Sequence, residues 1–139
     1  MYTFKKQERL CDKKTISSLY ASNKKTLTYP LSVHWLLLPP DKQPCPLQVL
    51  IVAPKKKLHN AVDRNRTKRL MRECYRTRKQ QLIDALEQQG QAMALGINYL
   101  HTAPPDFKHL QRSFDRLIDN LVEQVKQNGQ NEQKEHKEQ

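Results

Sequence analysis

Residues 61–78 read AVDRNRTKRLMRECYRTR, and this stretch carries the densest positive charge of the chain. The segment 55–79 has a net charge of +9, out of +11 for all 139 residues. The residues before it carry +5 and those after it −3. Charge concentrated in this way, with a pI near 9.7, favours a nucleic acid as the partner.

The same stretch lacks Gly and Pro and is rich in Arg, Lys, Leu and Met, which predicts a helix. Because successive residues of a helix are rotated by about 100°, the polar residues of this helix fall on one broad face. Its members are Arg64, Asn65, Lys68, Arg69, Arg72 and Arg76. The opposite face, expected to be buried, holds Val62, Leu70, Met71 and Cys74. Like charges four residues apart oppose an isolated helix by roughly 0.2–0.5 kcal/mol per pair, so the pattern predicts a polyanion that neutralises them.

The flanking segments predict a small mixed sheet covered by helices, an α/β (α+β) two-layer sandwich. Asp12 is expected to cap a short helix ending near residue 23, and Asn60 to cap the basic helix, which Gly90 ends. After residue 78 the helical pattern fits either one bent helix or two. Strands are predicted near Leu27 and over residues 31–38, 47–53 and 93–100.

Pro104 and Pro105 are expected to open a last helix. Its predicted buried face comprises Phe107, Leu110, Phe114, Leu117, Ile118, Leu121, Val122 and Val125. Residues 127–139 contain no apolar side chain, which predicts a disordered polar tail. The sequence therefore predicts a single domain over residues 1–126 and a tail over 127–139.

The cysteines indicate a reducing compartment. Cys11, Cys45 and Cys74 are odd in number and form no C-x-x-C pair, so we expect reduced thiols, with Cys74 in the core. No apolar run approaches the roughly 18 residues of a membrane span, and the N-terminus lacks the apolar core of a signal peptide. We therefore expect a cytoplasmic protein without membrane contact.

No arrangement typical of an independent enzyme is present. The five histidines show no metal-ligand spacing. The chain contains no H-E-x-x-H, P-loop or G-x-G-x-x-G motif. We expect neither a catalytic residue nor a metal site in this chain alone.

Residues 60–76, NAVDRNRTKRLMRECYR, resemble the signature of the bacterial ribonuclease P protein component. Arg64-Asn65-Arg66, Lys68-Arg69 and Arg72-Glu73 form the core of the match. They follow a strand that ends in consecutive lysines, and the resemblance extends over about residues 4–122. It implies a fold like ribosomal protein S5 domain 2. Two departures are Ile16, where the family usually has an aromatic residue, and Pro54, where it usually has Ser.

The resemblance implies a monomeric protein that binds a catalytic RNA and the 5′ leader of precursor tRNA. That RNA, with Mg²⁺ and no organic cofactor, removes the leader; the protein supplies no catalytic group. Positions matching the family's RNA-subunit contacts are Lys55, Lys56, Asn60, Arg64, Asn65, Arg66, Lys68, Arg69 and Arg72. Positions matching its leader-binding cleft are Ile16, Tyr20 and His34, with either Trp35 or Val33 as a further position, depending on which way the strand faces.

The residue types suit these roles, because Arg binds phosphate through two parallel hydrogen bonds and Tyr can stack on an unpaired base. Two alternatives stay open on the sequence. One is a general structured-RNA or ribosome-binding protein that uses the same face. The other is a DNA-binding protein with the basic helix in a major groove, although a strand, not a helix, precedes that helix.

Overall fold

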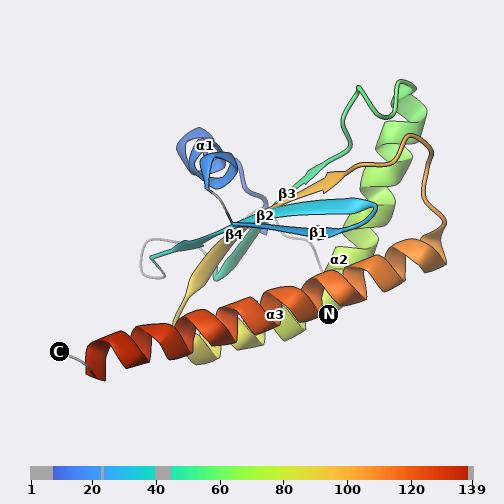
Figure 1. Ribbon diagram of the computed structural model, residues 1–139. Coiled ribbons are helices and arrows are strands. Elements are labelled where there is room, and N and C mark those ends of the chain that lie inside the picture. Colours follow the sequence, from blue (N-terminus) through green and yellow to red (C-terminus); the bar gives the residue numbers. More distant parts are fainter. Residues whose placement is uncertain (1–7, 23, 40–44, 138–139) are drawn as a thin grey trace.

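The computed structural model describes residues 8–22, 24–39 and 45–137, with side chains up to residue 127 (Figure 1). The elements follow the order α1 (Lys13–Ala21), β1 (Lys25–Thr28), β2 (Leu31–Leu38), β3 (Leu47–Val52), α2 (Ala61–Gln89), β4 (Ala92–Tyr99) and α3 (Phe107–Lys137). Every predicted helix and strand is present, and the mixed α+β architecture is confirmed.

The four strands form one sheet in the order β1-β2-β4-β3. β2 runs antiparallel to both β1 and β4, whereas β3 runs parallel to β4. Because parallel neighbours need a crossover, the long helix α2 connects β3 to β4. This connection places the start of α2 beside the end of β3, so the basic segment begins at the edge of the sheet.

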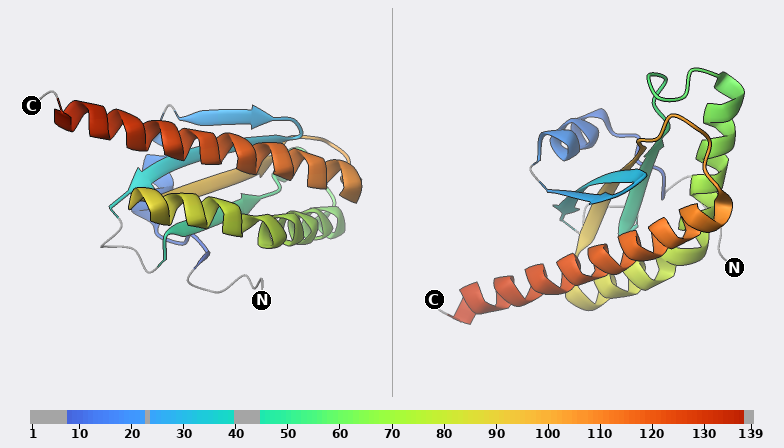
Figure 2. Two further views of the ribbon diagram at one scale, coloured as in Figure 1. Left: turned by 90° about the horizontal axis from the view of Figure 1, so that it is seen from below. Right: turned by 45° about the vertical axis from the view of Figure 1, so that its right-hand side comes forward.

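Both faces of the sheet are covered, but unequally. Alternate residues of a strand point to opposite faces, and Leu31, Val33 and Trp35 of β2 enter the main core with α2 and α3. The intervening Leu36 and Leu38 pack with α1 in a second, smaller cluster. Figures 1 and 2 show α2 and α3 side by side on one face, with α1 on the other. The short α1 thus adds a partial third layer to the predicted two-layer sandwich.

Helix α2 is one continuous element with both predicted caps. The Asn60 side chain accepts a hydrogen bond from the Val62 N–H at 2.9 Å. Gly90 ends the helix in the left-handed conformation, with φ of 62°. Only glycine adopts this conformation without a steric penalty, so its position decides where α2 stops.

Helix α3 differs from the prediction at both ends. Phe107 was expected to be buried but is 37% exposed, because it stands in the first turn, before the helix reaches the core. The segment predicted to be disordered continues the helix as far as Lys137. Its Gln, Glu and Lys residues are good helix formers, so a segment without apolar side chains can still extend an existing helix. The domain boundary at residue 126 stays a prediction.

A glycine allows α1 to lie close to the sheet. Gly96 of β4 faces α1, and a Cβ atom added there would lie 2.9 Å from the Tyr20 hydroxyl oxygen and 3.1 Å from Leu19 Cδ2. Leu19 is fully buried in this contact. The absent side chain at position 96 therefore sets the distance between α1 and β4.

We predict that Gly96→Ala lowers the free energy of unfolding by about 1–3 kcal/mol, because the added methyl group overpacks this contact. Urea denaturation measures the change. In a Tyr20→Ala background the cost should be smaller, since only the Leu19 contact remains. An equal cost in both backgrounds would contradict the role assigned to Tyr20.

Candidate nucleic-acid interface

The exposed side of α2 carries a compact group of polar and basic side chains. Asn65, Arg66, Arg69 and Arg72 are exposed, and Lys68 is half-buried at their margin. We call these five residues the basic face. Met71 and Cys74 lie on the opposite side with no exposed surface, as predicted.

The centre of this face differs from the predicted helix faces: Arg66, predicted as an RNA contact, was not counted on the polar face, and Val62 was placed among the buried residues. Val62 is 72% exposed. Together with Asn65, Arg66 and Arg69 it lines a shallow hollow on α2. The reason is that Thr67 and Tyr75, which the prediction left out, are fully buried and turn the helix toward their side.

The cations of the basic face are not neutralised by the carboxylates that the structure describes. Within that part of the chain, Arg66, Lys68, Arg69 and Arg72 form no salt bridge. Further along α2 the situation changes, since Arg76 pairs with Glu73, Arg78 with Asp115 and Lys79 with Glu8. Free positive charge is therefore concentrated in the first half of the helix.

The Glu8–Lys79 pair has a structural role. Its Nζ–Oε1 distance is 2.6 Å and both side chains are largely buried. Leu10 donates its N–H to the Val49 carbonyl at 2.9 Å in the same region. These contacts hold the N-terminal segment against β3 and α2.

The loop between β3 and α2 is held in a definite shape that exposes its lysines. Leu58 is buried and anchors the loop in the main core. The N–H groups of Lys57 and Leu58 both donate to the Pro54 carbonyl. Lys55, Lys56 and Lys57 consequently stand exposed beside the start of α2.

The Arg64 side chain also helps to hold this loop in place. Its Nη1 donates to the carbonyl oxygens of Leu58 and His59, each at 2.9 Å. The sequence placed Arg64 among the RNA contacts, but these bonds direct its guanidinium toward the loop. The lone apolar Leu58 within a basic loop was the signal that could have pointed to a folded, anchored segment.

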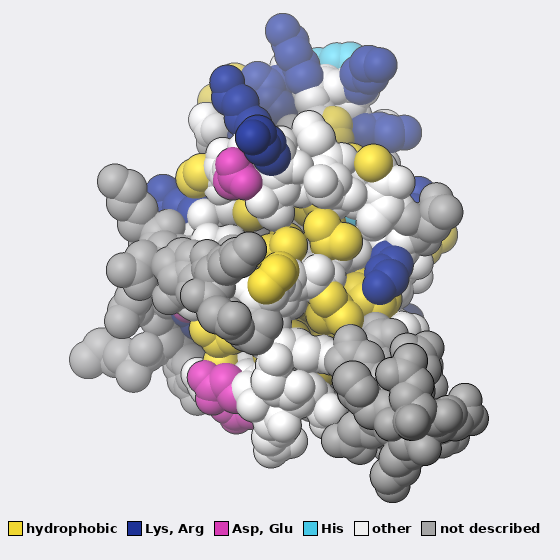
Figure 3. Space-filling view, turned by 90° about the vertical axis from the view of Figure 1, so that its left-hand side faces the viewer, with side chains coloured by type: hydrophobic (Ala, Val, Ile, Leu, Met, Phe, Trp, Pro, Cys, Tyr) yellow, Lys and Arg dark blue, Asp and Glu magenta, His cyan; other side chains and the backbone are white. Residues whose placement is uncertain are grey.

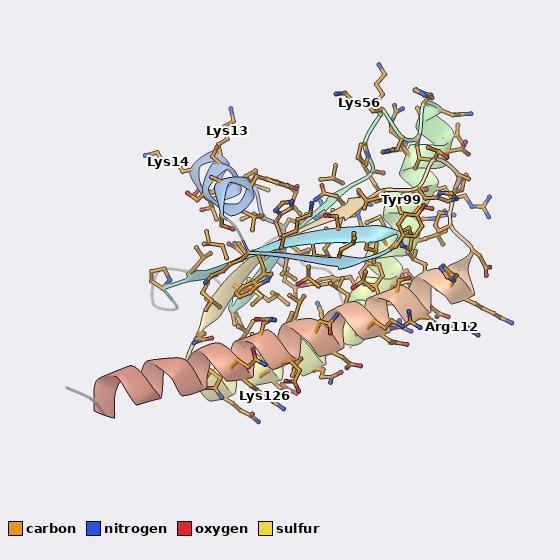
Figure 4. The ribbon with its side chains drawn as sticks, viewed as in Figure 1. Lys13, Lys14, Lys56, Tyr99, Arg112 and Lys126 are labelled. Carbon is orange, nitrogen blue, oxygen red and sulfur yellow. The ribbon has the colours of Figure 1, made fainter. Side chains whose placement is uncertain are left out.

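Further cations stand on α1. They lie on the same side of the sheet as the loop that carries Lys55, Lys56 and Lys57, which we call the lysine loop. In Figure 4, Lys13 and Lys14 project from α1 and Lys56 projects from the loop. Figure 3 shows the face on the α1 side, with Lys and Arg side chains along its upper part and an apolar area below them. The sheet surface between α1 and the loop is thus flanked by positive charge on both sides.

This sheet surface contains most of the predicted leader site. The Tyr20 and His34 ring centroids are 4.8 Å apart, with the rings tilted by 55°. The Tyr20 hydroxyl donates to Asn98 Oδ1 at 3.1 Å. Ile16 lies half-buried with the small cluster under α1. Asn98 was missed because its facing depends on the register of β4.

Trp35 does not belong to this surface, contrary to the prediction. It is 5% exposed and packs in the main core, on the other face of the sheet from His34. Adjacent residues of a strand face opposite sides of the sheet. Because His34 faces Tyr20, its neighbour Trp35 must face the other side.

The two rings of this surface are uncharged near neutral pH. Burial, reinforced by the positive charge of Lys25, lowers the pKa of His34. Burial also raises the pKa of Tyr20. His34 Nδ1 is buried without a hydrogen-bond partner in the described part of the chain. Neutral rings of this kind suit stacking and hydrogen bonding with bases.

In the part of the chain that the structure describes, the cysteines and possible metal ligands form no second candidate site. Burial raises the pKa of Cys74 to about 11, so its thiol stays protonated in the core, as expected for a packing residue. Among the described residues, no group of three or more His, Cys, Asp or Glu side chains could hold a metal ion. No described helix has the length and apolar character needed to span a membrane.

Sequence comparison identifies the family. The family described as Ribonuclease P matches residues 4–122. The chain belongs to the ribonuclease P protein family. It is 33% identical over 128 residues to the ribonuclease P protein component of Chlorobium phaeobacteroides, covering 86% of this chain and 88% of that protein. It is 30% identical over 113 residues to that of Porphyromonas gingivalis, covering 81% and 82%.

The fold agrees with this family. The Staphylococcus aureus RNase P protein superimposes with a TM-score of 0.57 at 17% identity, covering 81% of this chain and 93% of that one. Membership makes the chain a component of an endoribonuclease ribonucleoprotein in tRNA processing, associated with the ribonuclease P RNA. The predicted family and the general role are confirmed.

We predict a pH effect on stability that depends on His34. Because the folded state lowers the pKa of His34, the unfolded state binds its proton more tightly. The contribution of His34 to stability is therefore complete above about pH 6.5 and is lost as the pH falls through the lower, folded value. Thermal melts should show a smaller loss between neutral and mildly acidic pH for His34→Asn than for the unchanged chain. An identical loss would contradict this assignment.

Proposed function

We propose that the basic face and the lysine loop bind the catalytic RNA of ribonuclease P, and that the Tyr20–His34 surface binds the 5′ leader of precursor tRNA. The observation that carries this proposal is the set of basic-face cations without salt-bridge partners among the described residues. A folded RNA would supply the phosphates that neutralise them. The chain would act as a monomer and assist removal of the leader.

Rigidity of the basic face supports binding to a folded RNA. Asn60 and Asp63 stand at the start of α2, where a capping side chain and a negative charge stabilise the helix. Met71 and Cys74 fix its buried side. The Arg and Lys side chains therefore lose only their own rotamer freedom on binding, and the arginine forks can each contact a phosphate through two hydrogen bonds.

The Tyr20–His34 surface supports leader binding because it combines aromatic rings with flanking cations. Tyr20 is 37% exposed, so part of its ring is available to a base. Asn98 lies within hydrogen-bonding distance of its hydroxyl and offers an amide for a base edge or a 2′-hydroxyl. Ile16, half-buried beside them, would give an apolar contact where the family usually stacks an aromatic ring.

In this proposal the RNA, with Mg²⁺, carries out the cleavage. The chain positions the substrate and supplies positive charge near the reacting phosphate. Its residues need only bind and orient, which is the role that the described surfaces fit.

We predict that Arg69→Ala weakens binding to the ribonuclease P RNA by about tenfold and reduces the steepness of its salt dependence by about one unit. Filter binding at several salt concentrations measures both quantities. Arg76→Ala is the matched control, since it makes the same change on the same helix at a residue already paired with Glu73. Its effect should be smaller.

The same binding measurements on the unchanged chain and the Arg69→Ala variant distinguish this function from general RNA binding. An unrelated folded RNA of similar length serves as the competitor. If Arg69→Ala weakens both RNAs equally, and the unchanged chain does not prefer the ribonuclease P RNA, a general structured-RNA-binding role replaces the proposal.

We also predict that Tyr20→Ala, tested in the assembled holoenzyme, reduces affinity for precursor tRNA by about 1–3 kcal/mol without changing affinity for mature tRNA. Tyr20→Phe keeps the ring and should retain most of the preference. Equal losses for precursor and mature tRNA would argue against leader contact at this position.

A further inference from the structure

Strand β1 leaves one edge of the sheet open, at a distance from the basic face. In the described part of the chain it pairs with β2 alone. The left view of Figure 2 shows β1 at the outer edge of the sheet, beside α3. Edge strands are usually shielded by charge, proline or a covering element, because their free backbone groups attract other strands. This edge has exposed lysines at its start, but it also exposes Leu27 by 64% and, just beyond the strand, Tyr29 by 59%.

The backbone of β1 presents a defined set of groups along this edge. The Trp35 N–H donates to the Lys24 carbonyl, so Lys24 and Trp35 form a hydrogen-bonded pair. In an antiparallel ladder such pairs alternate with pairs whose backbone groups point away. The register of Lys25 with His34 and of Leu27 with Ser32 therefore directs the N–H and C=O of Lys25 and Leu27 outward.

A groove of about 520 Å³ runs between this edge and α3. It is lined by Leu27, Thr28, Tyr29, Arg116, Asp119 and Asn120. Tyr29 is held at its end, since its hydroxyl lies 3.0 Å from His101 Nδ1 and its carbonyl accepts a bond from the Ser113 hydroxyl at 3.4 Å. The groove is thus a formed feature of two packed elements.

One lining residue has an unsatisfied polar atom. Thr28 is 9% exposed, and its Oγ1 is buried without a hydrogen-bond partner in the described part of the chain. A buried hydroxyl without a partner is unfavourable for the chain alone.

The lining of the groove is balanced in charge, and the excess of positive charge at this edge comes from the lysines at the start of β1. Arg116 lines the groove and forms no salt bridge with the described residues. Lys25 of β1 and Lys24 just before the strand stand exposed, and the Lys24 Nζ lies 4.9 Å from the Trp35 ring centroid. Asp119 is the single carboxylate in the lining. This excess favours an anionic occupant.

We propose that the β1–α3 groove is a docking site for an extended acidic peptide of a partner protein, which adds a strand to β1. An extended polypeptide is the chemistry that complements alternating outward N–H and C=O groups. Side chains on one face of the added strand would contact Leu27. Those on the other face would enter the groove, where carboxylates meet Arg116. The groove side of this site lies against α3, on the other face of the sheet from Tyr20 and His34, although Lys25 stands opposite His34 in the strand register.

The first experiment uses the full chain, labelled with ¹⁵N, and the end-blocked peptide Val-Glu-Val-Glu-Val-Glu. We expect chemical-shift changes at the amides of Lys25 and Leu27 and at neighbouring α3 residues. A peptide with Lys in place of Glu, and one with N-methylated alternate amides, should both bind at least about tenfold more weakly. The first tests charge and the second tests strand pairing.

Arg116→Glu should weaken binding of the acidic peptide by about tenfold or more. Arg112→Glu is the matched control, because it reverses an exposed charge one turn earlier on α3, outside the groove lining. Its effect should be smaller, and circular dichroism should show both variants folded. Affinity for the ribonuclease P RNA should not change in Arg116→Glu, so this test does not depend on the RNA proposal.

Several outcomes would overturn the peptide site. One is the absence of shifts at about 1 mM peptide, a limit set by weak but specific association. Others are shifts confined to the basic face, or equal losses in the two charge-reversal variants. Protection of the β1 amides by single-stranded RNA, or by self-association of the chain, would assign the edge to a different occupant.

Discussion

The structure depends on the burial of one side of α2 against the sheet and α3. Each large side chain that is fully buried contributes roughly 1.5–3 kcal/mol, whereas each like-charge pair on the exposed side opposes the helix by roughly 0.2–0.5 kcal/mol. Met71, Leu82 and Leu86 are all completely buried, so burial outweighs the repulsion. The helix is therefore stable before any RNA binds, with its cations already directed outward.

The positive residues of the basic segment form two groups: one is exposed to solvent, and the other forms salt bridges within the chain. Those in the first half of α2 and in the preceding loop face solvent, while Arg76, Arg78 and Lys79 bind carboxylates of the chain itself. Arg64 stands between the groups, since its guanidinium secures the loop that exposes the lysines. A positive charge in the sequence is thus no direct measure of charge available to a partner.

The opposite face of the sheet is only partly covered, which leaves polar and aromatic side chains accessible on it. Gly96 lets α1 lie close to β4, and the short α1 leaves Tyr20 partly exposed next to His34. A longer helix would have buried these rings in a second core. The outer edge of β1 is likewise left without a neighbouring strand among the described residues. There, α3 forms the second wall of a groove.

The sequence by itself determined the order of the elements, the caps at Asn60 and Gly90, the concentration of charge and the family. These properties depend on neighbours within a few turns or strand residues, which composition and period reveal. Tertiary structure decided that Val62 is exposed, that Arg64 binds the loop, that Trp35 lies in the main core and that Asn98 joins Tyr20. A period gives the angle between side chains of one element, but which side faces inward is decided by packing partners far along the chain.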